Sequence, residues 1–170
     1  MVRYLGFIVA FGLVASAHAQ NRDRLDAPGK VPFGTSYEAA KKILGPGATE
    51  TRSGLRHAKG LTCSDCFDAA KGAQFSVFFS TDDRMVRVEI SKPIGREKSL
   101  DECLRNENEL WPVLIRPYGQ PNRRRGSKLA HSSVDVFTFK DGGLIEYMAS
   151  ASFGSCAFRV IFMTKDGQHL

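Results

Sequence analysis

Alternation of apolar and polar residues with a period of two is the main pattern in this chain, and it predicts β-strands. In residues 84–91, the apolar positions Val86, Val88 and Ile90 alternate with Met85, Arg87 and Glu89. Such alternation is typical of a strand with one buried face and one wet face. The apolar run 74–80 precedes it across three turn residues, so the pattern predicts an antiparallel hairpin.

Three further β-rich runs follow in the last third of the chain, at 134–140, 144–151 and 156–163. The sequence Asp-Gly-Gly at 141–143 separates the first two. Glycine tolerates the positive φ that tight hairpin turns require, so this spacing predicts a second hairpin and then a third paired strand. A short strand is also expected near 48–52.

Helical spacing of apolar residues occurs in two segments. The first begins at a Thr35–Glu38 capping box and ends at a Gly-Pro-Gly sequence. The second begins at a Ser99–Glu102 capping box, and Pro112 interrupts or ends it because proline cannot donate to an interior helical turn. The pattern therefore predicts two helices, each followed by strands.

Two helices and several antiparallel strands predict an α+β fold. The expected architecture is an antiparallel sheet of about five to seven strands with both helices packed on one face. The helix-then-strands order occurs over 34–92 and again over 99–164, which suggests a tandem repeat within one domain at 34–170. Residues 20–33 are polar and contain two prolines, so they are expected to form a flexible leader.

Residues 1–19 read as a cleaved secretory signal. Arg3 precedes an apolar run over 5–15, and a small-x-small sequence ends at Ala19, the pattern that a signal peptidase accepts. The run is shorter than the roughly 20 residues that span a bilayer. Gln20 follows the expected cut, where a lipid anchor would need cysteine. We therefore expect a mature chain without a transmembrane segment, in the bacterial periplasm or outside the cell.

The charge balance favours anionic partners. The chain has 24 Lys and Arg against 18 Asp and Glu, a net charge of +6, and removal of Arg3 with the signal leaves +5. Acidic proteins, lipopolysaccharide, phospholipid headgroups and cell-wall polymers fit such a surface. The densest basic cluster is Arg123, Arg124, Arg125 and Lys128, which predicts either an anion or partner contact or a solvated hairpin tip. Export argues against nucleic acid.

Four cysteines in an exported chain predict disulfides. Three connectivities are available to Cys63, Cys66, Cys103 and Cys156. Close spacing favours 63–66, and 103–156 could then join the second helix to the last strand. The longer bridge closes a loop of roughly 50 residues, worth about 4 kcal/mol in the chain-entropy model. Crossed pairings stay open because residues 48–73 have no sustained periodicity.

Cys63 and Cys66 also permit a redox interpretation. A thioredoxin-like pair needs its first cysteine at a helix N-terminus after an apolar strand, and neither context is present. With His57 they supply only three metal ligands, and Phe67 stands where haem attachment requires histidine. The sequence therefore predicts a structural disulfide, with no metal and no cofactor.

A hydrolase triad is the remaining catalytic candidate. His131, Ser132, Ser133 and Asp135 lie close in sequence, but no Gly-x-Ser-x-Gly elbow accompanies them. We interpret this stretch as a loop entering a strand. No other constellation indicates catalysis.

The stretch GTSYEAAKKILGP at 34–46 resembles the helix opening of small bacterial envelope proteins of the outer-membrane-assembly lipoprotein (small protein A) type and of the related β-lactamase-inhibitor-like fold. Tyr-Gly-Gln-Pro at 118–121 is similar to the end of a second copy. The resemblance implies a helix-then-strands fold that acts through protein contacts. It carries over no functional residue, because the chain lacks the anchor cysteine, places Pro46 directly after Gly45, and has extra cysteines.

The leading hypothesis is thus an exported, non-enzymatic binding protein of the bacterial envelope, stabilised by disulfides. The alternative is a periplasmic thiol-disulfide oxidoreductase or redox-sensing protein that uses Cys63 and Cys66.

Overall fold

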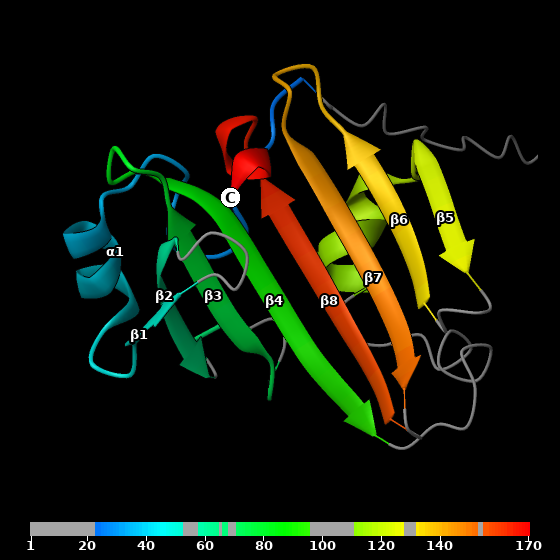
Figure 1. The fold of residues 1–170 in the computed structure, drawn as a ribbon, viewed down its shortest axis with the longest axis horizontal. Coiled ribbons are helices and arrows are strands. Elements are labelled where there is room, and N and C mark those ends of the chain that lie inside the picture. Colours follow the sequence, from blue (N-terminus) through cyan, green and yellow to red (C-terminus); the bar gives the residue numbers. More distant parts are fainter. Residues whose placement is uncertain are drawn as a thin grey trace, which may run out of the picture.

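Eight antiparallel strands form one continuous sheet in the computed structural model of the chain (Figure 1). The strand order is β1-β2-β3-β4-β8-β7-β6-β5. The structure describes residues 23–52, 58–64, 66–67, 71–95, 111–127, 132–152 and 155–170. The strands are β1 (Thr49–Arg52), β2 (Lys59–Ser64), β3 (Gln74–Phe79), β4 (Met85–Gly95), β5 (Arg123–Ser127), β6 (Ser132–Thr138), β7 (Leu144–Ser152) and β8 (Ser155–Met163).

The sheet consists of two four-stranded meanders. Strands β1 to β4 pair in sequence order, β5 to β8 do the same, and β4 pairs with β8 in the centre. The helix α1 (Tyr37–Leu44) precedes the first meander, and the helical turns η1 (Trp111–Ile115) and η2 (Arg116–Tyr118) precede the second. A helical segment therefore precedes each meander, an α-helix in the first case and short helical turns in the second.

The prediction of two α-helices is matched only in part. Within the described residues α1 is the single α-helix, and the fold is mostly β. Residues 99–110, where the second helix was expected, lie outside the described part of the chain. The segment that follows has π-helical and then 3-10 geometry, and Pro112 lies within it, where it cannot donate a backbone hydrogen bond.

Local capping determines where α1 begins and ends. The N-cap is Ser36, whose hydroxyl accepts a hydrogen bond from the Ala39 N–H at 3.4 Å, and Glu38 lies in the first turn, where a negative charge is favourable. Thr35, the predicted cap, instead donates its hydroxyl to Pro32 O at 2.7 Å. Gly45 ends the helix with φ of 79°, a conformation that glycine adopts without steric cost.

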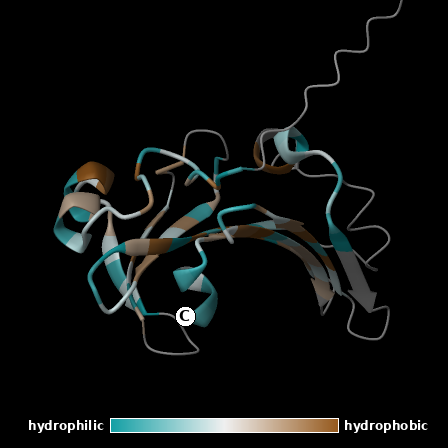
Figure 2. Ribbon diagram, turned by 90° about the horizontal axis from the view of Figure 1, so that it is seen from above, coloured by the Kyte–Doolittle hydropathy of each residue, from teal (hydrophilic) through white to brown (hydrophobic). Residues whose placement is uncertain are grey.

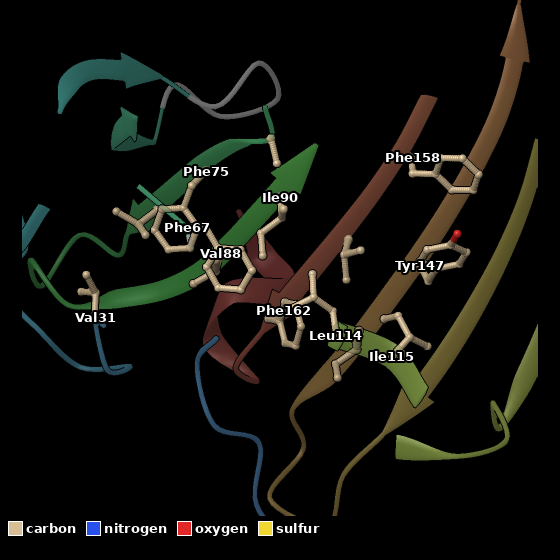
Figure 3. Close-up of a cluster of buried hydrophobic side chains, with 14 of the residues drawn as sticks. Val31, Phe67, Phe75, Val88, Ile90, Leu114, Ile115, Tyr147, Phe158 and Phe162 are labelled. Carbon is tan, nitrogen blue, oxygen red and sulfur yellow. The ribbon is translucent and has the colours of Figure 1, made fainter. Parts of the chain in front are cut away.

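One hydrophobic cluster lies on a single side of the sheet (Figure 3). Aromatic and aliphatic side chains of β3, β4, β7 and β8 form its floor. Tyr37 and Ala40 of α1 and Leu114 and Ile115 of η1 belong to the same cluster. Both helical segments therefore pack on one face, as a sheet with one apolar side requires.

Part of the predicted flexible leader packs on this core. Residues 23–33 form a strap in which Leu25 is 4% exposed and Val31 is fully buried. The Leu25 N–H donates to Asp141 Oδ2 at 2.9 Å, and the carboxylate also accepts from the Gly143 N–H at 2.8 Å. Two buried apolar side chains and the shared carboxylate of Asp141 therefore hold the strap against the sheet. The polar composition of the segment did not indicate this packing.

The sheet is curved. Viewed along its edge, the strap and the η1–η2 turns lie on the convex side, and the opposite side forms the inside of the curve (Figure 2). Within the described residues, no helix is long and apolar enough to cross a membrane.

Candidate functional site

The side of the sheet opposite the core, called the outer face below, is mostly left uncovered by the described elements of the fold. Among the described elements, only η3 (Asp166–His169) packs against it, at one end (Figure 1), where Gly167 lies against the backbone of Val86. Two adjacent cross-strand rows define the face, together with Arg87. The first row is Thr62, Ser76, Glu89, Ile161, Glu146, Val136 and Arg123, and the second is Ser64, Gln74, Ser91, Arg159, Met148 and Val134.

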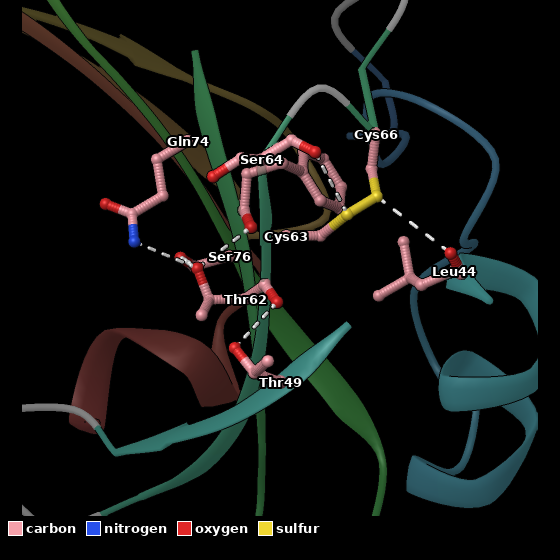
Figure 4. The surroundings of a disulfide bond; sticks show 9 residues. Leu44, Thr49, Thr62, Cys63, Ser64, Cys66, Gln74 and Ser76 are labelled. Carbon is pink, nitrogen blue, oxygen red and sulfur yellow. Dashed lines mark hydrogen bonds between the residues drawn. A yellow bond between two sulfur atoms is a disulfide. The ribbon is translucent and has the colours of Figure 1, made fainter. Parts of the chain in front are cut away.

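The outer face has a polar half and an apolar half. On β2 and β3, the Thr62 and Ser76 hydroxyls lie 2.9 Å apart and Gln74 Nε2 donates to Thr62 Oγ1 at 3.1 Å (Figure 4). On β6 and β7, half-buried Val134 and Met148 occupy the corresponding places. The surface therefore offers hydrogen-bonding groups on one side and apolar contact area on the other.

A charged cluster lies at the centre of this face, on the β4–β8 pair. Glu89 Oε1 lies 2.6 Å from Arg87 Nη2, and Glu89 Oε2 accepts hydrogen bonds from Nε of Arg159 at 3.1 Å and from its Nη2. The Glu89 and Arg87 side chains are only 13% and 11% exposed, whereas Arg159 is 45% exposed. One carboxylate is thus held between two guanidinium groups, and one of these faces solvent.

The cluster has a surplus positive charge. Arginine keeps its proton at any physiological pH, so two guanidiniums and one carboxylate sum to +1. Arg87 Nε is buried and has no hydrogen-bond partner among the described residues. Removal of the carboxylate would leave that guanidinium buried and uncompensated, which is costly.

The cysteine prediction is confirmed for one pair. Cys63 and Cys66 form a disulfide (Figure 4). Cys63 is the fifth residue of β2 and is 3% exposed, and the sulfur of Cys66 lies 3.9 Å from Leu44 O at the end of α1. Cys63 therefore belongs to a strand and does not occupy the helix N-terminus that lowers the pKa of catalytic cysteines.

The disulfide also anchors a core aromatic ring. Phe67 directly follows Cys66, is 8% exposed, and stacks on Phe75 with ring centroids 5.8 Å apart. Cys66 and Phe67 line a cavity of about 150 Å³, together with Leu44 and Ile43. The bridge therefore joins β2, the end of α1 and the Phe67 ring.

Replacing both Cys63 and Cys66 by serine is expected to lower the free energy of unfolding by about 2 kcal/mol, the chain-entropy value for a loop of a few residues. Urea denaturation under non-reducing conditions measures it, with Ser64→Ala as the control on an exposed neighbour. Loss of the folded state in the double variant would contradict the local role of the bridge.

Of the other predicted bridge, between Cys103 and Cys156, only Cys156 is among the described residues. Cys156 is disulfide-bonded and 1% exposed, in β8 opposite Gly95 of β4. Cys103 lies outside the described residues.

Three residues of the basic cluster, Arg123, Arg124 and Arg125, lie in an edge strand. Residues 123–127 form β5, which pairs with β6. The Arg123 side chain is exposed, and its partner in the register is Val136 of the outer face. Lys128 lies outside the described residues. Arg123 is the member of this cluster whose side chain is described, and it lies at the margin of the outer face.

The hydrolase and metal candidates lie only partly within the described residues. Asp135 is 4% exposed and shares the core face with Phe137. Ser133 lies on the same side of β6 as Asp135, and Ser132 lies on the opposite side. His131 and His57 lie outside the described residues. Within the described ranges, no group of three or more His, Cys, Asp and Glu side chains could hold a metal ion.

A second polar cluster ties α1 to the first edge of the sheet. The Tyr37 hydroxyl donates to Glu50 Oε1 at 2.7 Å, and Lys59 Nζ lies 3.3 Å from the centroid of the Tyr37 ring. Burial, and then this hydrogen bond, raises the pKa of Tyr37 to about 12. The same bond is the main cause that lowers the pKa of Glu50.

This cluster predicts a pH dependence of stability. A phenol whose pKa rises from 10.0 to about 12 on folding stabilises the protein fully below pH 10, and this contribution is lost as the pH rises through 12. We expect Tyr37→Phe to remove part of the decline in the free energy of unfolding between pH 10 and 12. Urea denaturation at pH 8 to 12 measures both proteins, and identical slopes would contradict the assignment. Tyr118, whose burial also raises its pKa, contributes equally to both.

No family model matches the chain, and no curated protein or solved structure shows significant similarity to it. The resemblance to small envelope proteins therefore stays a prediction.

Proposed function

We propose that the protein is an exported, disulfide-stabilised binding protein of the bacterial envelope, with the outer face of its sheet as the contact surface. The observation that carries this proposal is the division of the sheet. The strap, α1 and η1 cover one side, and only η3 among the described elements lies on the other. Phe78, Ile161 and Met163 are buried on this side, but the described elements leave the rest of it uncovered, and that part is available to a partner.

The composition of the outer face supports a protein partner. Met148, Val134 and Val136 supply apolar area beside Arg159, and methionine and arginine are enriched in protein interfaces relative to other surfaces. The curvature brings both edges of the sheet toward this side (Figure 2). A convex protein surface fits such a shape, whereas a flat bilayer would touch only its edges.

Export is the second part of the proposal and rests on residues 1–19. N-terminal sequencing of the mature protein from a periplasmic extract tests it. We expect the chain to start at Gln20. A chain that retains the first nineteen residues in the cytosol would overturn this part.

The alternative, a thiol-disulfide oxidoreductase, has one observation in its favour: Cys66 borders a cavity. An attacking thiolate that reached the sulfur of Cys66 would break the disulfide and release Cys63 as a thiolate. Cys63 is buried, and burial in apolar surroundings makes a thiolate unfavourable. The placement therefore favours a structural bridge, with a reduction potential below about −300 mV. An alkylation-coupled redox titration that gave a strongly oxidising potential would support the alternative.

A pair of charge insertions tests the contact surface. Met148→Lys and Val134→Lys place ammonium groups in the apolar half of the outer face, and a lysine on the wet side of a sheet need not disturb the core. Thr81→Lys, in the exposed β3–β4 turn, adds the same charge elsewhere. We expect the first two variants to fold and to elute as free protein in size-exclusion chromatography of an envelope extract. The Thr81→Lys variant should elute in complex with the envelope partner. Retention of the complex by all three variants would exclude the outer face.

A further inference from the structure

Arg159 lies where an interface would have its centre. It is in β8, one of the two middle strands of the sheet, and its cross-strand neighbours are Ser91 of β4 and Met148 of β7. Residues that dominate the free energy of binding cluster near the centre of interfaces, and arginine is enriched among them.

One edge of the Arg159 guanidinium is already occupied. Nε and Nη2 both donate to Glu89 Oε2, so the lateral edge of the group is filled. Within the described part of the chain, Nη1 makes no hydrogen bond. The terminal edge, formed by Nη1 and the second N–H of Nη2, can therefore donate two parallel hydrogen bonds to a carboxylate.

Glu89 orients the Arg159 side chain, and the cluster that they form with Arg87 still has a net positive charge. Both oxygens of Glu89 are engaged, one by each arginine, and the carboxylate is only 13% exposed. An arginine that is already oriented loses less side-chain freedom when it binds. The described charges of the outer face are Arg87, Arg159 and Arg123 against Glu89 and Glu146, which leaves a surplus of +1.

We propose that Arg159 is the anchor of the outer face and binds an aspartate or glutamate side chain that a protein partner presents among apolar residues. The inference rests on the proposed function and names the chemistry of its partner. The partner's carboxylate lies on the terminal edge of the Arg159 guanidinium, and its apolar neighbours contact Met148 and Val134.

The test compares Arg159→Gln with Arg24→Gln, using the full mature chain. Arg24 lies on the strap, and its side chain is 82% exposed, so its replacement removes the same charge far from the outer face. A photo-crosslinking amino acid at Ser150, next to Met148, captures the partner from the intact envelope. Mass spectrometry then identifies the partner, and calorimetry with that purified protein measures the dissociation constant of each variant.

We expect Arg159→Gln to weaken binding at least tenfold and Arg24→Gln to leave it within twofold. The contact region of the partner should contain an Asp or Glu whose replacement by Asn or Gln weakens the wild-type complex but not the Arg159→Gln complex. Unchanged binding by Arg159→Gln overturns the anchor and leaves the outer face as the contact surface. Absence of any crosslink from Ser150 overturns the proposed function itself.

A second arm uses vesicles of phosphatidylglycerol and phosphatidylcholine as the probe for a lipid source of the anion. We expect no cosedimentation that depends on Arg159. Cosedimentation that Arg159→Gln abolishes and Arg24→Gln does not would replace the protein carboxylate with a lipid phosphate and would overturn the proposal.

Discussion

Replacing Phe162 by alanine is expected to lower the free energy of unfolding by about 3 to 5 kcal/mol, the range for a fully buried aromatic side chain. Phe162 is 1% exposed and lies in β8 between Val88 of β4 and Ile145 of β7. It therefore belongs to the seam that joins the two meanders (Figure 3). Urea denaturation followed by fluorescence and by circular dichroism measures the effect.

The matched control for this prediction is Thr138→Ala, an exposed position at the end of β6, which should stay within about 0.5 kcal/mol of the wild type. Because the seam makes one sheet from two meanders, both probes should report a single transition. A loss below about 1 kcal/mol for Phe162→Ala, or two separate transitions in the wild type, would contradict the continuous core.

The second large effect is expected for Glu89→Gln, with a loss of about 3 kcal/mol. The substitution keeps the shape of the side chain and removes its charge. Arg87, 11% exposed, then remains nearly buried without a counter-ion, and a guanidinium cannot lose its proton to relieve the cost. Asp26→Asn is the control, since its ion pair with Arg24 is exposed on both sides and should contribute little.

A compensating variant separates the buried charge from the lost contact. Arg87→Met combined with Glu89→Leu removes both members of the near-buried pair. We expect it to recover most of the stability lost in Glu89→Gln, because a well-packed apolar pair can replace a buried ion pair without loss. Equal destabilisation by the double variant and by Glu89→Gln would show that the uncompensated charge is not the cause.

The sequence predicted the strands whose apolar residues alternate, and it missed two that have little apolar content. In β2 only Leu61 and Cys63 are apolar, and β5 begins with three arginines. Each has backbone hydrogen bonds to a neighbouring strand that alternation reveals, β3 and β6 respectively. A strand near the edge of a sheet can be stabilised by pairing with a neighbouring strand, even when its own sequence has few apolar residues.

The sequence predicts which side of its strand each residue of the candidate site occupies, but it does not predict that these residues contact one another. Alternation assigns Arg87 and Glu89 to the wet side of one strand and Arg159 to the wet side of another. Their contact depends on the pairing of β4 with β8, and Glu89 and Arg159 are 70 residues apart in the chain. Nothing local in the sequence fixes that register. The disulfide between Cys63 and Cys66, by contrast, follows from a separation of 3.

The most direct measurement of the role of the outer face is a photo-crosslinking profile in the intact envelope. The crosslinker is placed in turn at Ser150 and Ser91 on the outer face, at Lys42 on α1, and at Thr81 in the β3–β4 turn. We predict adducts of one discrete mass from the two outer-face positions and none from the other two. Adducts from Lys42 or Thr81 with none from Ser150 and Ser91 would show that the protein meets its partner elsewhere.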